Sequence, residues 1–188
     1  ALVEFALSLP ILLAFGLGGL ELANLAMAHM RVSQIALMTA DNASRVRVSI
    51  DETDVNELFL GAELAGDSMD FEENGRLILS SLEMNEEADG QWIRWQRCFG
   101  EKDYDSSYGE EGDGEDDDDL QAMGPPGQQV AALSGTAVMF VEVAYEYQPI
   151  VPNSITGDEM IVYTAAFNVR DRDNQAITNL SDATASSC

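Results

Sequence analysis

Residues 1–30 read ALVEFALSLPILLAFGLGGLELANLAMAHM, and most of them are apolar. Residues 5–20 carry no charge, and apolar residues continue past Glu21 to Met30. An apolar segment of roughly 20 residues is long enough to span a bilayer. The stretch therefore predicts a helix that is apolar on all sides and needs lipid or neighbouring helices around it.

Residues 31–50, RVSQIALMTADNASRVRVSI, extend this helix with a different character. Their apolar residues recur at mostly helical spacing, so one face can pack against a folded domain. Because no helix breaker lies between Val32 and Ser49, we predict one helix over residues 1–50, with an apolar half (1–30) and an amphipathic half (31–50). Such a helix is roughly 75 Å long.

The rest of the chain, residues 51–188, predicts a small α+β head. Residues 51–66 read as a second helix, with acids in its first turn where they favour the helix dipole. Alternating apolar and polar residues then predict four strands, at 76–84, 91–99, 136–147 and 160–169. We expect these strands to form an antiparallel sheet on one face of the long helix, giving a lollipop shape.

The chain is strongly acidic, with 34 Asp and Glu residues against 9 Lys and Arg and a net charge of −25. This charge excludes nucleic acid as a partner, because phosphates are bound by Lys and Arg. Residues 101–119 alone hold 11 acids, so we expect a solvated acidic loop. The alternative is a calcium site without EF-hand spacing. Its candidate ligands are Asp113, Glu115, Asp117 and Asp119.

The sequence begins with Ala1, and no basic leader precedes the apolar run. A secretory signal peptide has a charged first region and a small-residue cleavage site. We therefore expect a leader that has been removed while the apolar run was retained, as in an exported protein. In an exported chain the two cysteines, Cys98 and Cys188, are expected to form a disulfide.

Glu4 is a carboxylate in an otherwise apolar segment, where an uncompensated charge costs several kcal/mol. In a filament, the α-amino group of Ala1 in a neighbouring subunit can compensate it and set the axial register. Alternatively, Glu4 lies at the membrane–water interface and is stabilised by the helix dipole. Pro10 removes one helical hydrogen bond, which either lets the helix bend or is ordinary transmembrane proline usage.

The N-terminal pattern resembles the start of TadE/TadF-like pseudopilins of the tight-adherence system. Glu4, Phe5, Leu9 and Pro10 carry the resemblance, since that family has an acid, an aromatic and then Leu-Pro near its processed N-terminus. The resemblance implies a pilin-type helix, a prepilin peptidase, an inner-membrane assembly platform, and copies of the chain or related pilins as partners. It also implies passage from the inner membrane to a cell-surface pilus.

Enzyme motifs such as GxSxG, the P-loop, HExxH and CxxC are absent from the sequence. Trp92 and Trp95 fall on opposite faces of a strictly alternating strand, so we expect packing roles and no shared sugar platform. We predict a structural filament subunit, without an enzymatic activity and without a cofactor other than the possible calcium. The alternatives are a membrane-anchored periplasmic binding or assembly domain and a calcium-dependent surface adhesin.

Overall fold

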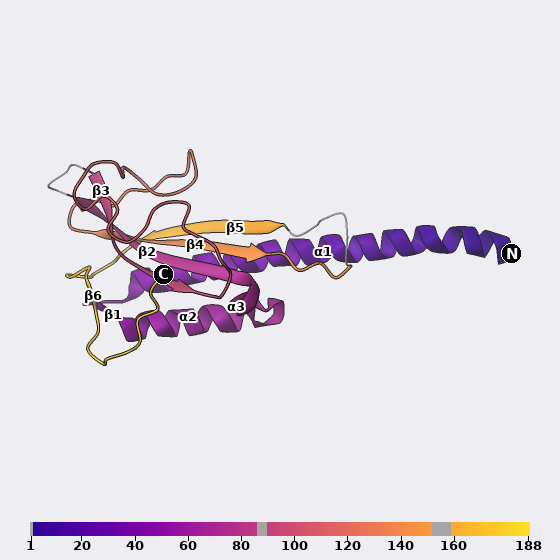
Figure 1. Ribbon diagram of the computed structural model, residues 1–188, viewed down its shortest axis with the longest axis horizontal. Coiled ribbons are helices and arrows are strands. Elements are labelled where there is room, and N and C mark those ends of the chain that lie inside the picture. Colours follow the sequence, from indigo (N-terminus) through magenta and orange to yellow (C-terminus); the bar gives the residue numbers. More distant parts are fainter. Residues whose placement is uncertain (1, 86–89, 152–158) are drawn as a thin grey trace.

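The N-terminal helix protrudes from a compact head, as Figure 1 shows. A computed structural model describes residues 2–85, 90–151 and 159–188. The helix α1 spans Leu2–Arg45 and continues through Pro10. Its first half extends away from the head, and its second half lies along a sheet. The predicted lollipop shape is confirmed.

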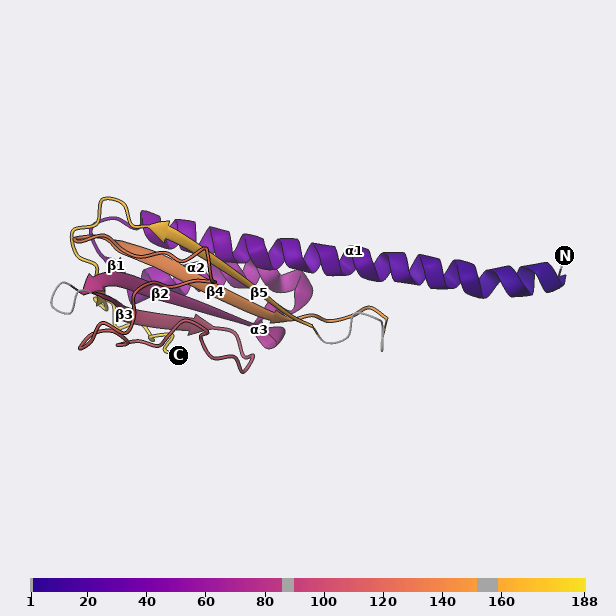
Figure 2. The ribbon, with the colours of Figure 1, turned by 90° about the horizontal axis from the view of Figure 1, so that it is seen from above.

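A four-stranded antiparallel sheet forms the centre of the head, and all four predicted strands are confirmed. Its strand order is β3-β2-β4-β5. The bounds are β2 Gly75–Asn85, β3 Gly90–Phe99, β4 Ala137–Glu146 and β5 Met160–Asn168. Turned by 90° in Figure 2, the sheet appears as a layer beside α1. The second helix α2 (Glu52–Gly66) packs beside α1 in the same core.

The core between helices and sheet explains why the second half of α1 is amphipathic. Its buried residues follow a spacing of three and four, which places them on one face of the helix. They are Val32, Ile35, Ala36, Ala40 and Ala43, and they belong to one cluster with Leu77, Leu79, Val141 and Val143 of the sheet. The small alanines allow the helix backbone to lie close to the strands.

The predicted end of the long helix at residue 50 is wrong, because α1 ends at Arg45. The carbonyl of Ala43 in its last turn and that of Val46 just beyond it accept hydrogen bonds from the guanidinium of Arg172, at 2.6 and 3.1 Å. Val48 then adopts a left-handed conformation with φ of 69°, which turns the chain. This arginine lies more than 120 residues further along the chain, so local sequence could not reveal the cap.

Short elements complete the head. The strand β1 (Ile50–Asp51) pairs in parallel with β6 (Ile177–Thr178). After α2 come the 3₁₀ turn η1 (Asp67–Met69) and the one-turn helix α3 (Phe71–Asn74). The polar tail is therefore paired with the head at β6.

The acidic segment 101–119 differs in part from a simple solvated loop. Many of its acids are exposed, but its backbone pairs with the free edge of β3. Ile93 donates to the carbonyl of Asp113 at 2.9 Å, and Gly112 donates to the carbonyl of Ile93 at 2.8 Å. Tyr108 and Leu120 pack on a second cluster at the outer face of the sheet. The loop thus covers a strand edge that would otherwise be open to pairing with another chain.

Candidate assembly site

The first half of α1, residues 3–20, is the largest apolar surface of the described chain, and we call it the shaft. Every residue in it is exposed, and its helix is long and apolar enough to cross a membrane. Its exposed large side chains are Val3, Phe5, Leu7, Leu9, Ile11, Leu12, Leu13, Phe15, Leu17 and Leu20. A surface of this kind indicates contact with lipid or protein, since soluble monomers rarely expose such patches.

The residues singled out in the N-terminal pattern lie on the shaft. Glu4 is in the first turn of α1, where a carboxylate is favoured by the helix dipole. Phe5 is 60% exposed. Ser8, two residues before Pro10, donates a hydrogen bond to the carbonyl of Phe5 at 3.2 Å. Ala1 lies outside the described residues, so its pairing with Glu4 stays a prediction.

We call the part of α1 around Glu21, where the helix passes from the shaft into the head, the neck. The sequence did not reveal the role of Glu21. Its side chain is only 4% exposed. The hydroxyl of Tyr147 donates to it at 2.6 Å, and the backbone amide of Val151 donates at 3.0 Å. Burial, followed by the hydrogen bond to Glu21, raises the pKa of Tyr147. The sequence did hold one signal for this role, because Glu21 is the charged residue that ends an uncharged run of 16 residues.

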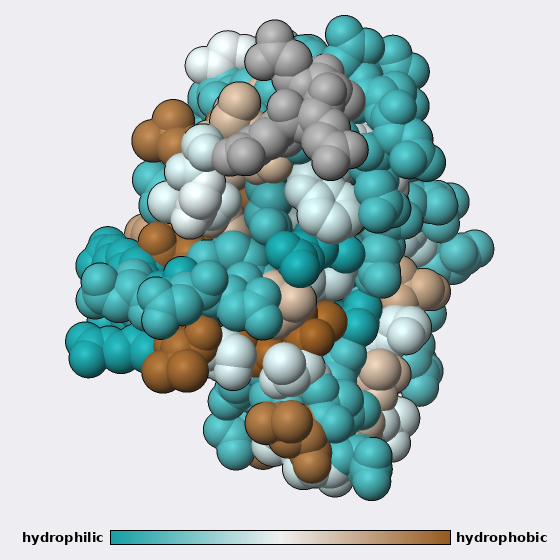
Figure 3. Space-filling view, turned by 90° about the vertical axis from the view of Figure 1, so that its left-hand side faces the viewer, coloured by the Kyte–Doolittle hydropathy of each residue, from teal (hydrophilic) through white to brown (hydrophobic). Residues whose placement is uncertain are grey.

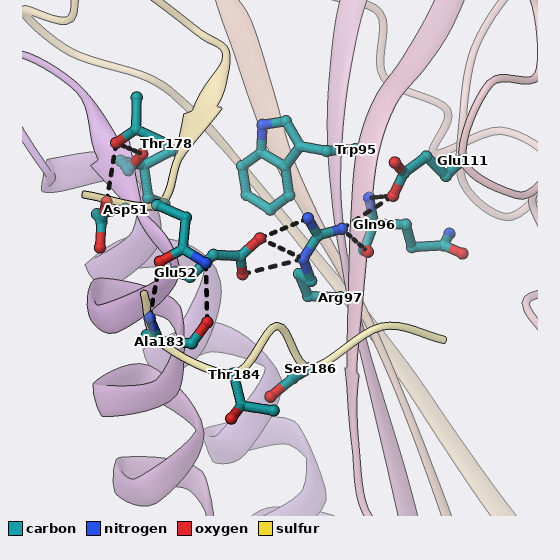
Figure 4. Close-up of polar contacts among 12 residues, drawn as sticks. Asp51, Glu52, Trp95, Gln96, Arg97, Glu111, Thr178, Ala183, Thr184 and Ser186 are labelled. Carbon is teal, nitrogen blue, oxygen red and sulfur yellow. Dashed lines mark hydrogen bonds and ion pairs between the residues drawn. The ribbon is translucent and has the colours of Figure 1, made fainter. Parts of the chain in front are cut away.

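A buried ion pair fastens α2 to the sheet, as Figure 4 shows. Arg97 on β3 donates from Nε and Nη2 to the carboxylate of Glu52, with a shortest distance of 2.6 Å. It also donates from Nη1 to Glu111 of the acidic loop at 2.9 Å. One guanidinium therefore joins the first turn of α2, an edge strand and the acidic loop.

The predicted disulfide between Cys98 and Cys188 is present, with the two Cα atoms 4.9 Å apart. Beside it, the amide of Cys98 donates to the carbonyl of Ser186 at 2.7 Å. The tail is also held by α2, because Asn56 donates to the carbonyl of Thr184 at 3.0 Å. The tail and the acidic loop together cover the free edge of β3.

The four proposed calcium ligands are exposed in the acidic loop. Two of them accept bonds within the loop: Asp113 accepts from the amide of Glu110 at 2.8 Å, and Asp117 from that of Asp119 at 3.1 Å. Within the described ranges, no group of three or more acidic, histidine or cysteine side chains is arranged to hold a metal ion. Calcium binding at Asp113, Glu115, Asp117 and Asp119 stays a prediction.

Among the residues that the structure describes, the end of the head remote from the shaft offers no comparable apolar surface. Figure 3 shows it as mostly hydrophilic, with separate hydrophobic spots. The exposed apolar residues Val48, Leu133 and Leu180 lie in connecting segments. The shaft is therefore the strongest candidate for an assembly surface.

Comparison with known proteins finds similarity in α1, the helix that carries the shaft. Neither the curated proteins nor the solved structures contain a match to the chain. A family model described as TadE-like protein matches residues 1–41, which cover the shaft, the neck and most of the buried half of α1. Through this helix the chain is similar to TadE-like proteins, a family associated with Tad pili.

Proposed function

We propose that the protein is a structural subunit, a pilin or pseudopilin, of an extracellular Tad or type IV-like pilus. The observation that carries the proposal is the shaft, which is entirely exposed within the single chain. Before assembly the shaft lies in the inner membrane. After extraction from lipid it packs against the shafts of other copies or related pilins.

Burial of the shaft supplies the driving force. Covering one large apolar side chain contributes about 1.5–3 kcal/mol relative to water, and the shaft has ten of them. Gly16, Gly18 and Gly19 have open space where a Cβ would stand, so neighbouring helices can approach closely there. The acidic heads coat the outside of the fibre and limit lateral clumping.

Glu4 is the proposed register residue of this assembly. A carboxylate placed among apolar helices must meet a cation or a donor, so only certain axial offsets between subunits are favourable. The amine of Ala1 in a neighbouring copy is one such cation. Phe5 and Pro10 shape the same end of the shaft.

Electron microscopy and mass spectrometry of material sheared from the cell surface test the proposal. The expected result is a fibre containing this chain, lost on Glu4→Ala and retained on Glu110→Ala, which changes an exposed acid of the head. The Cys98–Cys188 disulfide should form in both variants, reporting a folded head. A chain that stays in membranes as a monomer and never enters sheared material would instead indicate a membrane-anchored domain.

A further inference from the structure

We propose that a hollow at the neck binds the headgroup of a zwitterionic phospholipid, with Arg31 beside the phosphate and Asp70 beside a primary ammonium. This inference rests on the proposed function only where that function places the shaft in the inner membrane before assembly. A headgroup held there fixes the depth of the subunit in the bilayer until the shaft is extracted.

This neck hollow has a volume of about 310 Å³ and is lined by α1, by η1 and by the end of β4 with the residues that follow it. Its α1 residues are Asn24, Met27, Ala28 and Arg31. It lies at the end of the head from which the shaft emerges, where β4 ends (Figure 1). When the shaft spans a membrane, this end of the head faces the bilayer surface.

The position of the neck hollow along α1 matches the headgroup layer. From Leu2, where α1 begins, to Glu21 the helix rises about 29 Å, close to the roughly 30 Å of a hydrocarbon core. Asn24 and Arg31 lie about 5 and 15 Å beyond Glu21, while headgroups occupy about 5–8 Å on each side of the core. Because helical side chains point toward the N-terminus and arginine extends back to the interface, the guanidinium of Arg31 can reach a phosphate.

Two opposite charges line the neck hollow without pairing with each other. The ion pairs among the described residues use neither Arg31 nor Asp70. The guanidinium of Arg31 donates to the hydroxyl of Ser68, and a guanidinium has five N–H donors, so donors are left for a phosphate. Asp70 is exposed and comes from a different element, at the end of η1. A phosphate ester that carries a primary ammonium has a charge to match each of the two.

Apolar and aromatic side chains make the same hollow suitable for a lipid. Met27 and Ile150 line it and are 46% and 52% exposed, so they can cover the glycerol and the first methylenes of the acyl chains. Tyr145 and Tyr147 also line it and are buried. Tyrosine is typical of the membrane–water interface. These contacts distinguish a membrane lipid from a free soluble headgroup.

The acidity of the head selects against anionic lipids. The chain has a net charge of −25, and like charges repel an anionic surface. A second hollow shares Asp70 with the neck hollow and is lined by further acids, which are Glu63, Asp67, Glu72, Glu73 and Glu101. A zwitterionic headgroup has no net charge and offers its ammonium to Asp70, so it is favoured over an anionic one.

Lipid binding by the full chain in an uncharged detergent tests this site, with native mass spectrometry as the measurement. The probes are phosphatidylethanolamine, phosphatidylglycerol and soluble glycerophosphoethanolamine. Phosphatidylethanolamine should bind best. Phosphatidylglycerol should bind about threefold to fivefold more weakly, because it lacks the ammonium that forms one exposed ion pair. Glycerophosphoethanolamine should bind about tenfold more weakly or less, because it has no acyl chains to cover Met27 and Ile150.

Substitutions in the neck hollow separate the two charges. Arg31→Gln should weaken binding of both lipids about tenfold, because it removes charge-assisted hydrogen bonds to the phosphate, and Arg31→Lys should restore part of the affinity. Asp70→Asn should remove the preference for phosphatidylethanolamine over phosphatidylglycerol. The matched controls are Arg45→Gln, at the other end of the head, and Asp67→Asn, an exposed acid outside the lining of the neck hollow. Both should bind as the unsubstituted chain does.

Equal binding of the two lipids by the unsubstituted chain, or unchanged binding on Arg31→Gln, would overturn the site. Equally tight binding of glycerophosphoethanolamine would exclude a membrane lipid as its specific ligand. The Cys98–Cys188 disulfide reports whether each variant has a folded head. If Arg31→Gln does not fold, Asp70→Asn decides, because it keeps the contact between Arg31 and Ser68. The measurement needs no fibre, so a chain that binds the lipid but never enters sheared fibres would overturn the proposed filament and leave this inference standing.

Discussion

The hydroxyl of Tyr147 donates a hydrogen bond of 2.6 Å to the carboxylate of Glu21, across 126 residues of sequence. This contact joins the end of β4 to the point where α1 leaves the head. Asn24 donates in turn to the hydroxyl of Tyr147 at 2.8 Å. The neck is therefore held by a connected set of polar groups, which fixes the direction of the shaft relative to the head.

Tyr147→Phe is expected to destabilise the head by about 1–3 kcal/mol, because it leaves the buried carboxylate of Glu21 without one donor. Chemical unfolding of the full chain in detergent, followed by circular dichroism, measures the change. Tyr163→Phe is the control, since the hydroxyl of Tyr163 makes a longer contact of 3.3 Å with His29. Equal stability of both variants would show that the neck contact contributes little.

Removal of either partner from the buried pair of Arg97 and Glu52 is expected to cost about 3–5 kcal/mol, because the remaining charge is left uncompensated. Glu52→Gln and Arg97→Met should each show this loss in denaturant unfolding. The double variant should lose less than the two single losses added together. Glu111→Gln serves as control, since the side chain of Glu111 is 51% exposed and its pair should contribute no more than about 1 kcal/mol.

Loss of the disulfide is expected to cost roughly 4–5 kcal/mol in the chain-entropy model, since it closes a separation of 90 residues. Cys188→Ser should also raise the hydrogen-exchange rate of the Cys98 amide, which donates to Ser186. The amide of Leu79, in the interior strand β2, is the internal reference. Unchanged protection at Cys98 would mean that Asn56 and the other tail contacts hold the segment without the disulfide.

The parts of the fold that the sequence predicts are those governed by local periodicity. The four strands and α2 match their predicted ranges closely, because alternation and helical spacing are properties of neighbouring residues. The cap of α2 is likewise local, since Asp51 accepts from the amide of Thr53 at 3.1 Å.

The parts that escaped prediction depend on long-range contacts. Arg172 ends α1, and its position follows from the packed tail. Between Ser81 and Leu82 of β2 the pairing with β3 shifts. The shift makes Arg94 an additional residue in β3 and returns Trp92 to the side of the sheet that Trp95 occupies. Strict alternation predicts opposite faces for these tryptophans, so that prediction is wrong. The burial of Glu21 likewise requires Tyr147, from a distant strand.

Alkaline pH is expected to destabilise the head through its tyrosines. Burial, with the carboxylate of Glu142 adding to it, raises the pKa of Tyr104 to about 12. Burial and then the charge of Asp70 raise the pKa of Tyr145 to about 12. In the unfolded chain both groups lose their protons near pH 10. The folded state therefore holds more protons above pH 10, and stability falls as pH rises from about 10 towards 12.

Two measurements on the same samples check this expectation: tyrosinate absorbance and the free energy of unfolding as functions of pH. In the folded protein the absorbance change should lag behind that of the denatured chain, and stability should decline over the same interval. Tyr104→Phe removes one of the shifted groups, so its stability should depend less steeply on pH between 10 and 12. A folded-state titration that coincides with the denatured one would show that Tyr104 and Tyr145 ionise freely, which their burial against Glu142 and Asp70 does not allow.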